Sequence, residues 1–228
     1  MSSTVQSQLI GVMRKPRRPQ PLVIRLTHWI NIPVLAMMAM SGLQIFVAYP
    51  HFGPAMEQWD IPLLDDWTPP DLIRTGHGLA TGRGIHFLFA WILVINAVIY
   101  LAYTFLSGEY KRRYFWPPRD TRPMIQQIKY YLRIAKTPPP VDLYNGLQRQ
   151  AYTAAVVLGI VEVWSGLVIY KPVQLHWLGV VMGGYDGARL VHFAGLIALA
   201  GFVIGHVVMV ATHPKSFVEM ITGGKPHG

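Results

Sequence analysis

Cysteine is absent from this chain of 228 residues, and charged residues are scarce, at 14%. Without cysteine the chain cannot form disulfides, hold an iron–sulfur cluster through thiolates or attach a c-type haem covalently. A recognisable signal-peptide cleavage site is also missing after the first apolar stretch. That stretch is too long for a signal-peptide core, so we expect it to be retained. Acidic residues are few as well, with 11 Asp and Glu against 20 Lys and Arg.

Long apolar runs are what the chain has in abundance. Hydrophobic residues make up 52% of it and gather in four stretches, at about 23–48, 85–106, 148–170 and 189–211. Each stretch reaches the roughly 20 residues that an α-helix needs to cross about 30 Å of hydrocarbon. A soluble helical core is the alternative, but apolar blocks of this length are too long for it. The sequence therefore predicts an all-α membrane protein, a four-transmembrane-helix bundle that forms a single domain over 1–228.

The positive charges are distributed unevenly between the connections. Residues 1–27 carry five bases and no acid, and the connection 107–147 carries eight bases against three acids, whereas the connection 49–84 has five acids and two bases. The positive-inside rule then places both termini and the basic inner loop 107–147 in the cytoplasm, with the outer loop 49–84 and residues 171–188 outside the bacterial plasma (inner) membrane. The basic excess thus reflects topology, and no nucleic-acid partner is expected.

Two of these connections have features of their own. The outer loop 49–84 is rich in Pro, Trp, Asp and Gly, and its residues 74–84 are expected to be irregular chain or turns. A loop of this length without periodicity favours a functional role, and its acidic, aromatic character makes it a candidate docking surface. In the inner loop, residues 121–136 predict an amphipathic helix. This helix either lies along the anionic cytoplasmic leaflet or occupies a groove of a partner.

Four histidines in the apolar stretches match one another in depth. His192 and His206 are fourteen residues apart in the last stretch, which corresponds to about 21 Å of helix and brings the second to within about 40° of the direction of the first. They share one face near opposite membrane surfaces. His28 begins the first stretch at the depth of His206, and His86 begins the second at the depth of His192. This pairing predicts two haem b groups, an inner one held by His28 and His206 and an outer one held by His86 and His192.

The four histidines could also have roles other than haem ligation. A single histidine on an apolar helix is typically a hydrogen-bonded core residue, and only the matching depths of four favour haem. A zinc or copper site would gather three or four ligands at one depth instead of two pairs a membrane apart. The remaining histidines fall in loops or at ends and are expected at the surface: His51, His77, His176, His213 and His227.

An R-x-x-H pattern recurs at three of the four histidines, which are preceded by Arg25, Arg83 and Arg189. Residues three apart share a helix face, and helical side chains lean toward the N-terminus, so each arginine lies one turn nearer the water than its histidine. Each is therefore a candidate to pair with a haem propionate. The alternative is that these arginines only anchor the helix ends at the membrane surface. No repeat of the whole fold is evident.

Polar and small residues inside the spans carry further expectations. Glu162 should face the bundle interior, where it either serves a proton path or satisfies a donor such as Trp164. Asn96 is expected to make an interhelical hydrogen bond. Several glycines either leave room for a porphyrin face or let helices pack closely: Gly42, Gly159, Gly166, Gly195, Gly201 and Gly205.

Several sequence words carry a family resemblance. RLTHWIN at 25–31, SGLQIF at 41–46, HFLFAW at 86–91 and the pair of histidines in the last stretch resemble the bacterial two-haem cytochrome b membrane subunits of the hydrogenase and formate dehydrogenase type. The match is closest to the thiosulfate reductase cytochrome b subunit group and covers nearly the whole chain. The resemblance implies the four histidines as axial ligands, with electrons passing between a partner enzyme on the outer face and quinone near the inner haem.

A second resemblance concerns the start of the third stretch. Residues 144–149, YNGLQR, are similar to the Y-N-x-x-Q-[KR] segment of formate dehydrogenase membrane subunits. That similarity implies Asn145 and His206 as quinone contacts, with Gln148 as a further candidate. Taken without it, Asn145 is only a turn and helix-start signal. The long acidic outer loop departs from the formate dehydrogenase type. The best-matching group often accompanies a sulfite-oxidase-like molybdenum protein, so the resemblance implies such a partner.

Together these features predict a di-haem b-type cytochrome subunit that carries electrons across the plasma membrane between an exported redox enzyme and the quinone pool. Substrate chemistry would belong to the partner, so no catalytic residue is expected in this chain. One alternative is a stand-alone quinone-linked superoxide oxidase, although the basic outer funnel that such an anion favours is missing from the loop 49–84. The other alternative is a haem-free membrane anchor or transporter.

Overall fold

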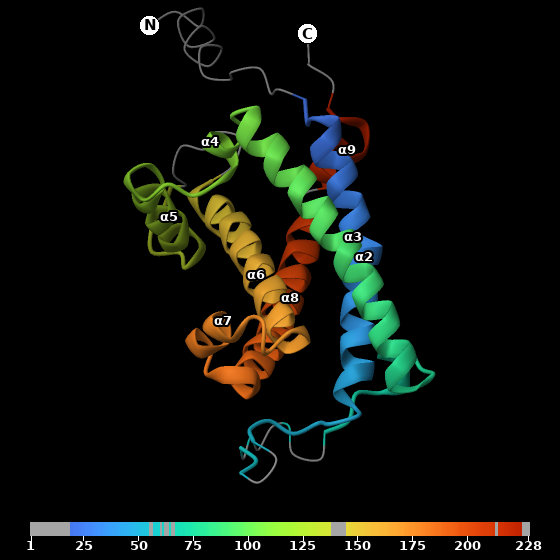
Figure 1. Ribbon diagram of the computed structural model, residues 1–228. Coiled ribbons are helices and arrows are strands. Elements are labelled where there is room, and N and C mark those ends of the chain that lie inside the picture. The colour runs from blue at the N-terminus through green and yellow to red at the C-terminus, as the bar shows by residue number, and fades with distance from the viewer. Residues whose placement is uncertain are drawn as a thin grey trace, which may run out of the picture.

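The structure, a computed structural model, describes residues 19–54, 57–59, 61, 64, 67–137, 145–212 and 214–224. Its long helices are α2 (Leu22–Phe46), α3 (Gly78–Leu106), α6 (Gly146–Tyr170) and α8 (Gly184–Thr212) (Figure 1). All four are long and apolar enough to cross a membrane. The described residues form no strand, and their only bridge joins Phe52 to Trp59. The predicted all-α fold with four membrane-spanning helices is confirmed.

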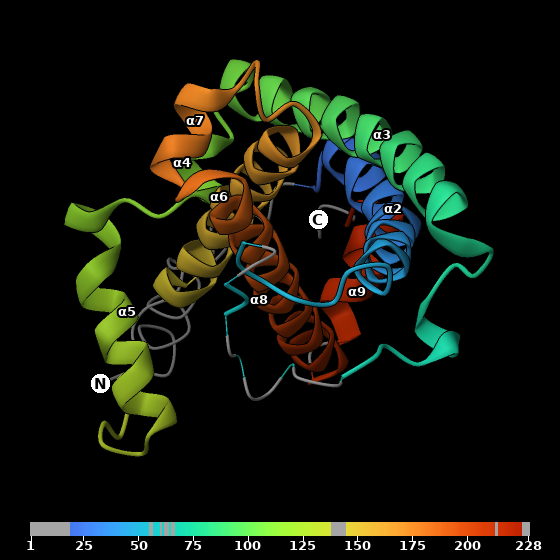
Figure 2. The same cartoon turned by 60° about the horizontal axis from the view of Figure 1, so that its bottom comes forward.

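The four long helices associate as two pairs. The chain packs α2 against α3 and α6 against α8, and close backbone approaches between the two pairs are few. Figure 1 shows α2 and α3 together on one side of the molecule and α6 with α8 on the other, and Figure 2 shows the same division from a second direction. Contacts between the pairs therefore depend on individual side chains more than on extended helix packing.

The helix α3 begins at Gly78, earlier than the predicted stretch 85–106. It follows His77, whose φ of 61° ends the preceding turn. The expectation of irregular chain over 74–84 is wrong for 78–84. Within this segment Gly82 lets α3 approach α2 closely, because a Cβ there would lie 3.0 Å from Cγ of Gln44.

A capping box starts α6. The side chain of Asn145 accepts a hydrogen bond of 2.8 Å from the backbone N–H of Gln148, and the side chain of Gln148 accepts one of 3.0 Å from the backbone N–H of Asn145. These two bonds satisfy N–H groups that a helix start otherwise leaves without partners. The helix-start signal at Asn145 is confirmed.

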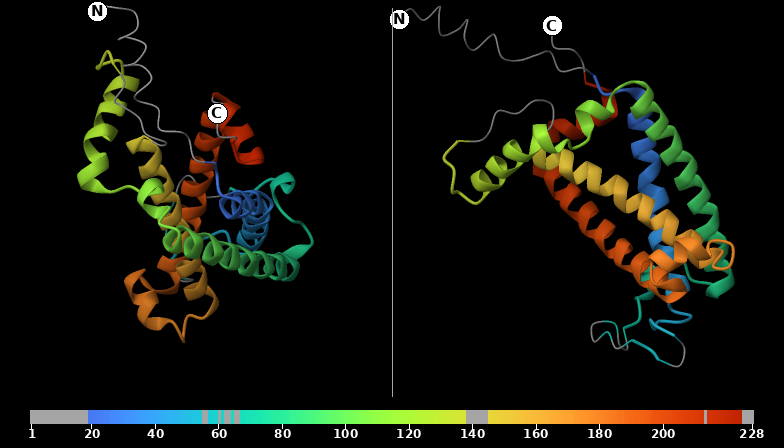
Figure 3. Two further views of the ribbon diagram at one scale, coloured as in Figure 1. Left: turned by 90° about the horizontal axis from the view of Figure 1, so that it is seen from above. Right: turned by 60° about the vertical axis from the view of Figure 1, so that its left-hand side comes forward.

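Shorter helices occupy the connections: η1 (Asp71–Ile73), α4 (Tyr110–Arg113), α5 (Pro117–Tyr131), α7 (His176–Val181) and α9 (Pro214–Thr222). The predicted amphipathic helix is α5, which starts earlier and ends earlier than the segment 121–136. It projects from the side of the bundle (Figure 3). Its apolar face is accessible, with Ile125 at 44% and Ile128 at 38% exposure.

The C-terminal helix α9 folds back onto the start of α2. The indole N–H of Trp29 and Nε of Arg25 each donate a hydrogen bond of 3.2 Å to the carbonyl of Met220. The ring of Phe217 meets the Trp29 ring edge to face, with centroids 5.8 Å apart. These contacts close α9 over the end of α2 that carries His28.

Candidate functional site

The four predicted histidines lie in two pairs. His28 on α2 faces His206 on α8, with ring centroids 6.0 Å apart and ring planes at 67°. His86 on α3 faces His192 on α8, with centroids 6.1 Å apart and planes at 74°. The structure thus brings together the same pairs that depth along the helices predicts. Each pair joins the α2–α3 half of the bundle to α8. His28 and His206 are called the inner pair below, and His86 and His192 the outer pair, after the sides predicted for them.

The separation within each pair suits two ligands of one metal ion. An imidazole nitrogen binds a metal at about 2.0–2.1 Å, and bonds of roughly 1.35 Å place that nitrogen about 1.2 Å from its ring centroid. Two imidazoles on opposite sides of one ion therefore have centroids roughly 6.4 Å apart. The observed 6.0 and 6.1 Å are close to this span. Within the part of the chain that the structure describes, no three His, Asp or Glu residues converge on a possible metal site.

Two buried serines contact the outer pair. The hydroxyl oxygen of Ser41 on α2 lies 3.0 Å from Nδ1 of His86. The hydroxyl oxygen of Ser165 on α6 lies 3.0 Å from Nδ1 of His192. Both serines are fully buried. Neither serine was singled out from the sequence as a functional residue.

The glycine after each serine faces the same imidazole. A Cβ at Gly42 would lie 3.4 Å from Cε1 of His86, and one at Gly166 would lie 3.2 Å from Cε1 of His192. At these two positions the missing side chain lets the histidine ring of the neighbouring helix approach closely. Room for a porphyrin face stays a prediction. By contrast, a Cβ at Gly159, Gly201 or Gly205 would meet nothing within 4 Å.

Glu162 also reaches the outer pair. Its Oε2 and its backbone carbonyl each lie 3.1 Å from Nδ1 of His192. Its side chain is 13% exposed, so the expectation that it faces the bundle interior is confirmed. Its contact is His192 and not Trp164, whose side chain is 51% exposed. A Cβ at Gly195 would collide with the Glu162 carboxyl.

The arginines of the R-x-x-H pattern differ in their contacts. Arg189 donates hydrogen bonds of 3.0 and 2.9 Å to the backbone carbonyls of Tyr49 and His51, which ties the outer loop to α8. Arg25 holds α9, as described above. Arg83 is exposed and lies over the ring of Phe87, with 5.9 Å from its guanidinium carbon to the centroid. Propionate pairing stays a prediction for all three.

The remaining histidines that the structure describes, His51, His77 and His176, are exposed as predicted. His213 and His227 lie outside the described residues.

The inner pair is bordered by aromatic rings: Trp29 lies edge to face with His28 at 5.5 Å, and Phe202 stacks on His206 at 5.9 Å.

Asn96 fixes α3 to α2 beside the inner pair. Its amide nitrogen donates hydrogen bonds of 2.8 Å to the carbonyl of Thr27 and 2.7 Å to Oδ1 of Asn31. The predicted interhelical hydrogen bond is confirmed. Because Thr27 directly precedes His28, these bonds also help to set the position of the His28 ring.

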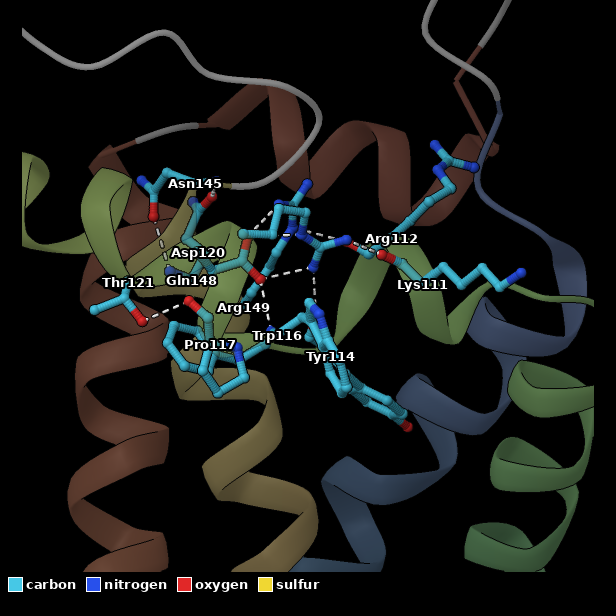
Figure 4. A network of polar contacts seen from close by, with 12 residues as sticks. Lys111, Arg112, Tyr114, Trp116, Pro117, Asp120, Thr121, Asn145, Gln148 and Arg149 are labelled. Carbon is cyan, nitrogen blue, oxygen red and sulfur yellow. Dashed lines mark hydrogen bonds and ion pairs between the residues drawn. The ribbon is translucent and has the colours of Figure 1, made fainter.

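A buried ion network lies where α5 meets the start of α6 (Figure 4). Asp120 accepts hydrogen bonds from Arg119, from Nη1 of Arg149 at 2.7 Å and from the backbone N–H of Trp116 at 2.7 Å. Burial alone would raise the pKa of Asp120, but these donors outweigh it and hold the pKa at about 2. The sequence analysis missed this network. Two prolines followed by Asp in a first helical turn signal the start of α5, although they do not reveal its partner.

Among the described residues, no hydrogen bond joins His206 to the other two predicted quinone contacts. Asn145 and Gln148 bind each other in the capping box, next to Arg149 and Asp120 (Figure 4). His206 faces His28. A shared quinone contact of these residues stays a prediction.

Four membrane-crossing helices that pair histidines within their apolar length define the chain as a membrane cytochrome of the b type. The chain belongs to the prokaryotic cytochrome b561 family, whose family model matches residues 20–223. It is also similar to a protein of Azospira oryzae named "Putative protein-methionine-sulfoxide reductase subunit YedZ1", with 35% identity over 203 residues, which is 89% of this chain and 95% of that protein. Family membership implies haem b and confirms the relationship to bacterial membrane cytochromes b. The narrower resemblance to hydrogenase and thiosulfate reductase subunits stays a prediction.

Proposed function

We propose that this protein is a di-haem cytochrome b subunit that carries electrons across the bacterial inner membrane. In this proposal His28 and His206 hold the inner haem, and His86 and His192 hold the outer one. The observation that carries the proposal is the presence of two histidine pairs, each with about the span of two axial ligands, at positions fourteen residues apart along α8. Haem iron supplies one-electron redox chemistry. The side chains of this chain supply ligation, orientation and burial.

The proposed orientation places both termini, α4 and α5 on the cytoplasmic side. The positive-inside rule supports it, because the basic inner loop and the N-terminal bases then share one side. The residues that begin α2 and end α9 lie at the same end of the bundle as α4 (Figure 1).

We propose that an exported redox enzyme docks at the outer face and performs the substrate chemistry. The name of the Azospira oryzae relative, a methionine sulfoxide reductase subunit, supports such a division of labour. The family resemblance suggests a sulfite-oxidase-like molybdenum protein. Aromatic rings form the base on which the outer loop rests: Phe46 stacks on Phe193 at 4.8 Å, and Phe52 of the loop lies 5.4 Å from the same ring. Because Phe193 adjoins His192, this base lies next to the outer pair.

Quinone is the proposed partner at the inner haem, with His206, Asn145 and Gln148 as its candidate contacts. The support is the resemblance of residues 144–149 to the quinone segment of formate dehydrogenase subunits. Electrons would then pass between the exported enzyme and the quinone pool along the axis of α8.

The test is haem content measured on purified protein by the pyridine haemochrome assay, together with reduced-minus-oxidised spectra. We expect about two haems per chain, and one in each of His206→Ala and His192→Ala, with different haems lost. The exposed His176 provides a matched control, and His176→Ala should retain both haems. Retention of both haems in His206→Ala would overturn the pairing, and absence of haem from the wild-type protein would exclude the function.

A further inference from the structure

We propose that Ser41 and Ser165 are positioning residues that fix the ring tautomer of the outer ligands and lower the reduction potential of the outer haem. The inference rests on the proposed function, since it takes His86 and His192 as haem ligands. It extends that function by assigning a role to two hydroxyl groups.

The first step concerns where each hydroxyl proton points. The Ser41 oxygen lies 2.6 Å from the carbonyl of Met37, and the Ser165 oxygen lies 2.7 Å from the carbonyl of Val161. A carbonyl only accepts hydrogen bonds, so each serine gives its single proton to its own helix. Each serine oxygen is then left as an acceptor.

The second step concerns the histidine that faces each oxygen. With an acceptor 3.0 Å away, Nδ1 of His86 and of His192 must carry the ring proton. The backbone carbonyl of Glu162, 3.1 Å from Nδ1 of His192, imposes the same tautomer because it also only accepts. A neutral imidazole protonated at Nδ1 has its free lone pair on Nε2. The serines therefore prepare Nε2 of both rings to bind iron.

The third step concerns the repetition of this device. Ser-Gly-Leu occurs at 41–43 on α2 and at 165–167 on α6. In each case the serine faces the histidine of the paired helix, and the following glycine makes room for that ring. The two helix pairs thus supply the two outer ligands in the same way. The same Ser-Gly sequence therefore lies against both rings of the outer pair.

The fourth step concerns the potential. A hydrogen bond from Nδ1–H makes the imidazole a stronger donor to the metal, which favours the oxidised, more positively charged iron. The inner ligands differ: the contacts that the structure gives the rings of His28 and His206 are with other rings, and neither ring is hydrogen-bonded among the described residues. We therefore expect the outer haem to be the more reducing of the two.

The experiment is a potentiometric titration of the full-length protein and of Ser41→Ala, Ser165→Ala and the double variant. Loss of a hydrogen bond worth about 1 kcal/mol changes the reduction equilibrium about fivefold, which is about 40 mV at ~59 mV per tenfold change. Ser41→Ala should raise the outer potential by an amount of this order. Ser165→Ala should raise it less, because the Glu162 carbonyl still accepts from Nδ1 of His192. The double variant should raise it further than Ser41→Ala alone, and the inner potential should move less. Thr104→Val is the matched control, because Thr104 is fully buried and bonds the carbonyl of Tyr100, as the serines bond theirs, but faces no histidine.

The outcomes separate this inference from the proposed function. If all variants keep two haems and the outer potential does not move, the role of the serines is refuted while the di-haem function stands. If an alanine variant loses the outer haem, Ser41→Thr and Ser165→Thr, which keep the hydroxyl, must restore both the haem and its potential, and failure to do so refutes the inference. If the His86→Ala variant keeps as many haems as the wild-type protein, the proposed function itself is refuted.

Discussion

Replacing Asp120 by asparagine tests whether the ion network holds α5 to the bundle. The Asp120 side chain is 1% exposed, and that of Arg149 is 9% exposed. Asp120→Asn keeps the shape of the side chain and removes its charge, so the buried guanidinium of Arg149 loses its ion pair with Asp120. Removal of one partner from a buried ion pair costs about 3–5 kcal/mol.

The pKa of Asp120 gives a second magnitude. A pKa of about 2 in the folded protein, against 3.8 for a free Asp side chain, corresponds to about 2–3 kcal/mol at roughly 1.4 kcal/mol per pKa unit. We take this lower figure, because Arg119, the other partner, is 39% exposed and keeps much of its hydration. A loss of about 2–3 kcal/mol raises the population of the undocked helix by about 30- to 150-fold.

Hydrogen exchange in detergent or nanodiscs measures this opening. The amides of α5 should exchange about 30- to 150-fold faster in Asp120→Asn than in the wild type, while haem content and the exchange of α2 stay the same. Asp71→Asn is the matched control, since Asp71 is 93% exposed in its ion pair with Arg74 and such a pair contributes about 0–1 kcal/mol. Unchanged exchange of α5 in Asp120→Asn would refute the reasoning.

The pH dependence has a definite sign. Because the folded pKa of Asp120 is below the unfolded value, its contribution is complete above about pH 5 and is lost as the pH falls through the folded pKa of about 2. Protection of α5, corrected for intrinsic exchange, should therefore be constant from about pH 5 to 8 and fall in acid, and Asp120→Asn should abolish that dependence.

Three further predictions concern close contacts. Gly146→Ala places a Cβ 2.7 Å from the backbone carbonyl of Asp120 and should destabilise the docking of α5 by about 1–3 kcal/mol in the same exchange assay, whereas Gly84→Ala, with open space around it, should not. Gly166→Ala pushes on the His192 ring at 3.2 Å, so it should shift the spectrum of the outer haem, and Gly159→Ala on the same helix should leave it unchanged. Asn96→Leu removes two hydrogen bonds in the membrane and should lower thermal stability by about 1 kcal/mol, measured as loss of helical signal on heating; an unchanged midpoint would contradict the role of Asn96.

The spans and the histidine pairs could be predicted because, in a membrane-spanning helix, the position of a residue in the sequence determines its depth in the bilayer. A helix advances by a fixed rise per residue, so the positions of His28, His86, His192 and His206 along their helices already order them between the two surfaces. The capping box at Asn145 could be read for a similar reason, since both of its partners lie within one turn.

What could not be predicted depends on contacts between distant segments. The helical start of α3 depends on Gly82 meeting Gln44 of another helix, and a glycine-rich segment read alone indicates turns. The pairing of Asp120 with Arg149 joins residues on two helices separated by a long connection. Ser41 and Ser165 are unremarkable residues in apolar helices until the structure places a histidine beside each one.

The sparse packing between the α2–α3 pair and the α6–α8 pair has a consequence for biogenesis. If haem fills the space between facing imidazoles, it supplies contacts between the two helix pairs that the protein itself makes only sparsely. Its binding free energy then contributes to the stability of the tertiary structure. Newly inserted chains that have not yet bound haem would remain as two helical hairpins, α2–α3 and α6–α8, joined by the connecting chain. We expect cells starved of iron or porphyrin to hold little of this protein, because quality-control proteases would remove such chains before they mature.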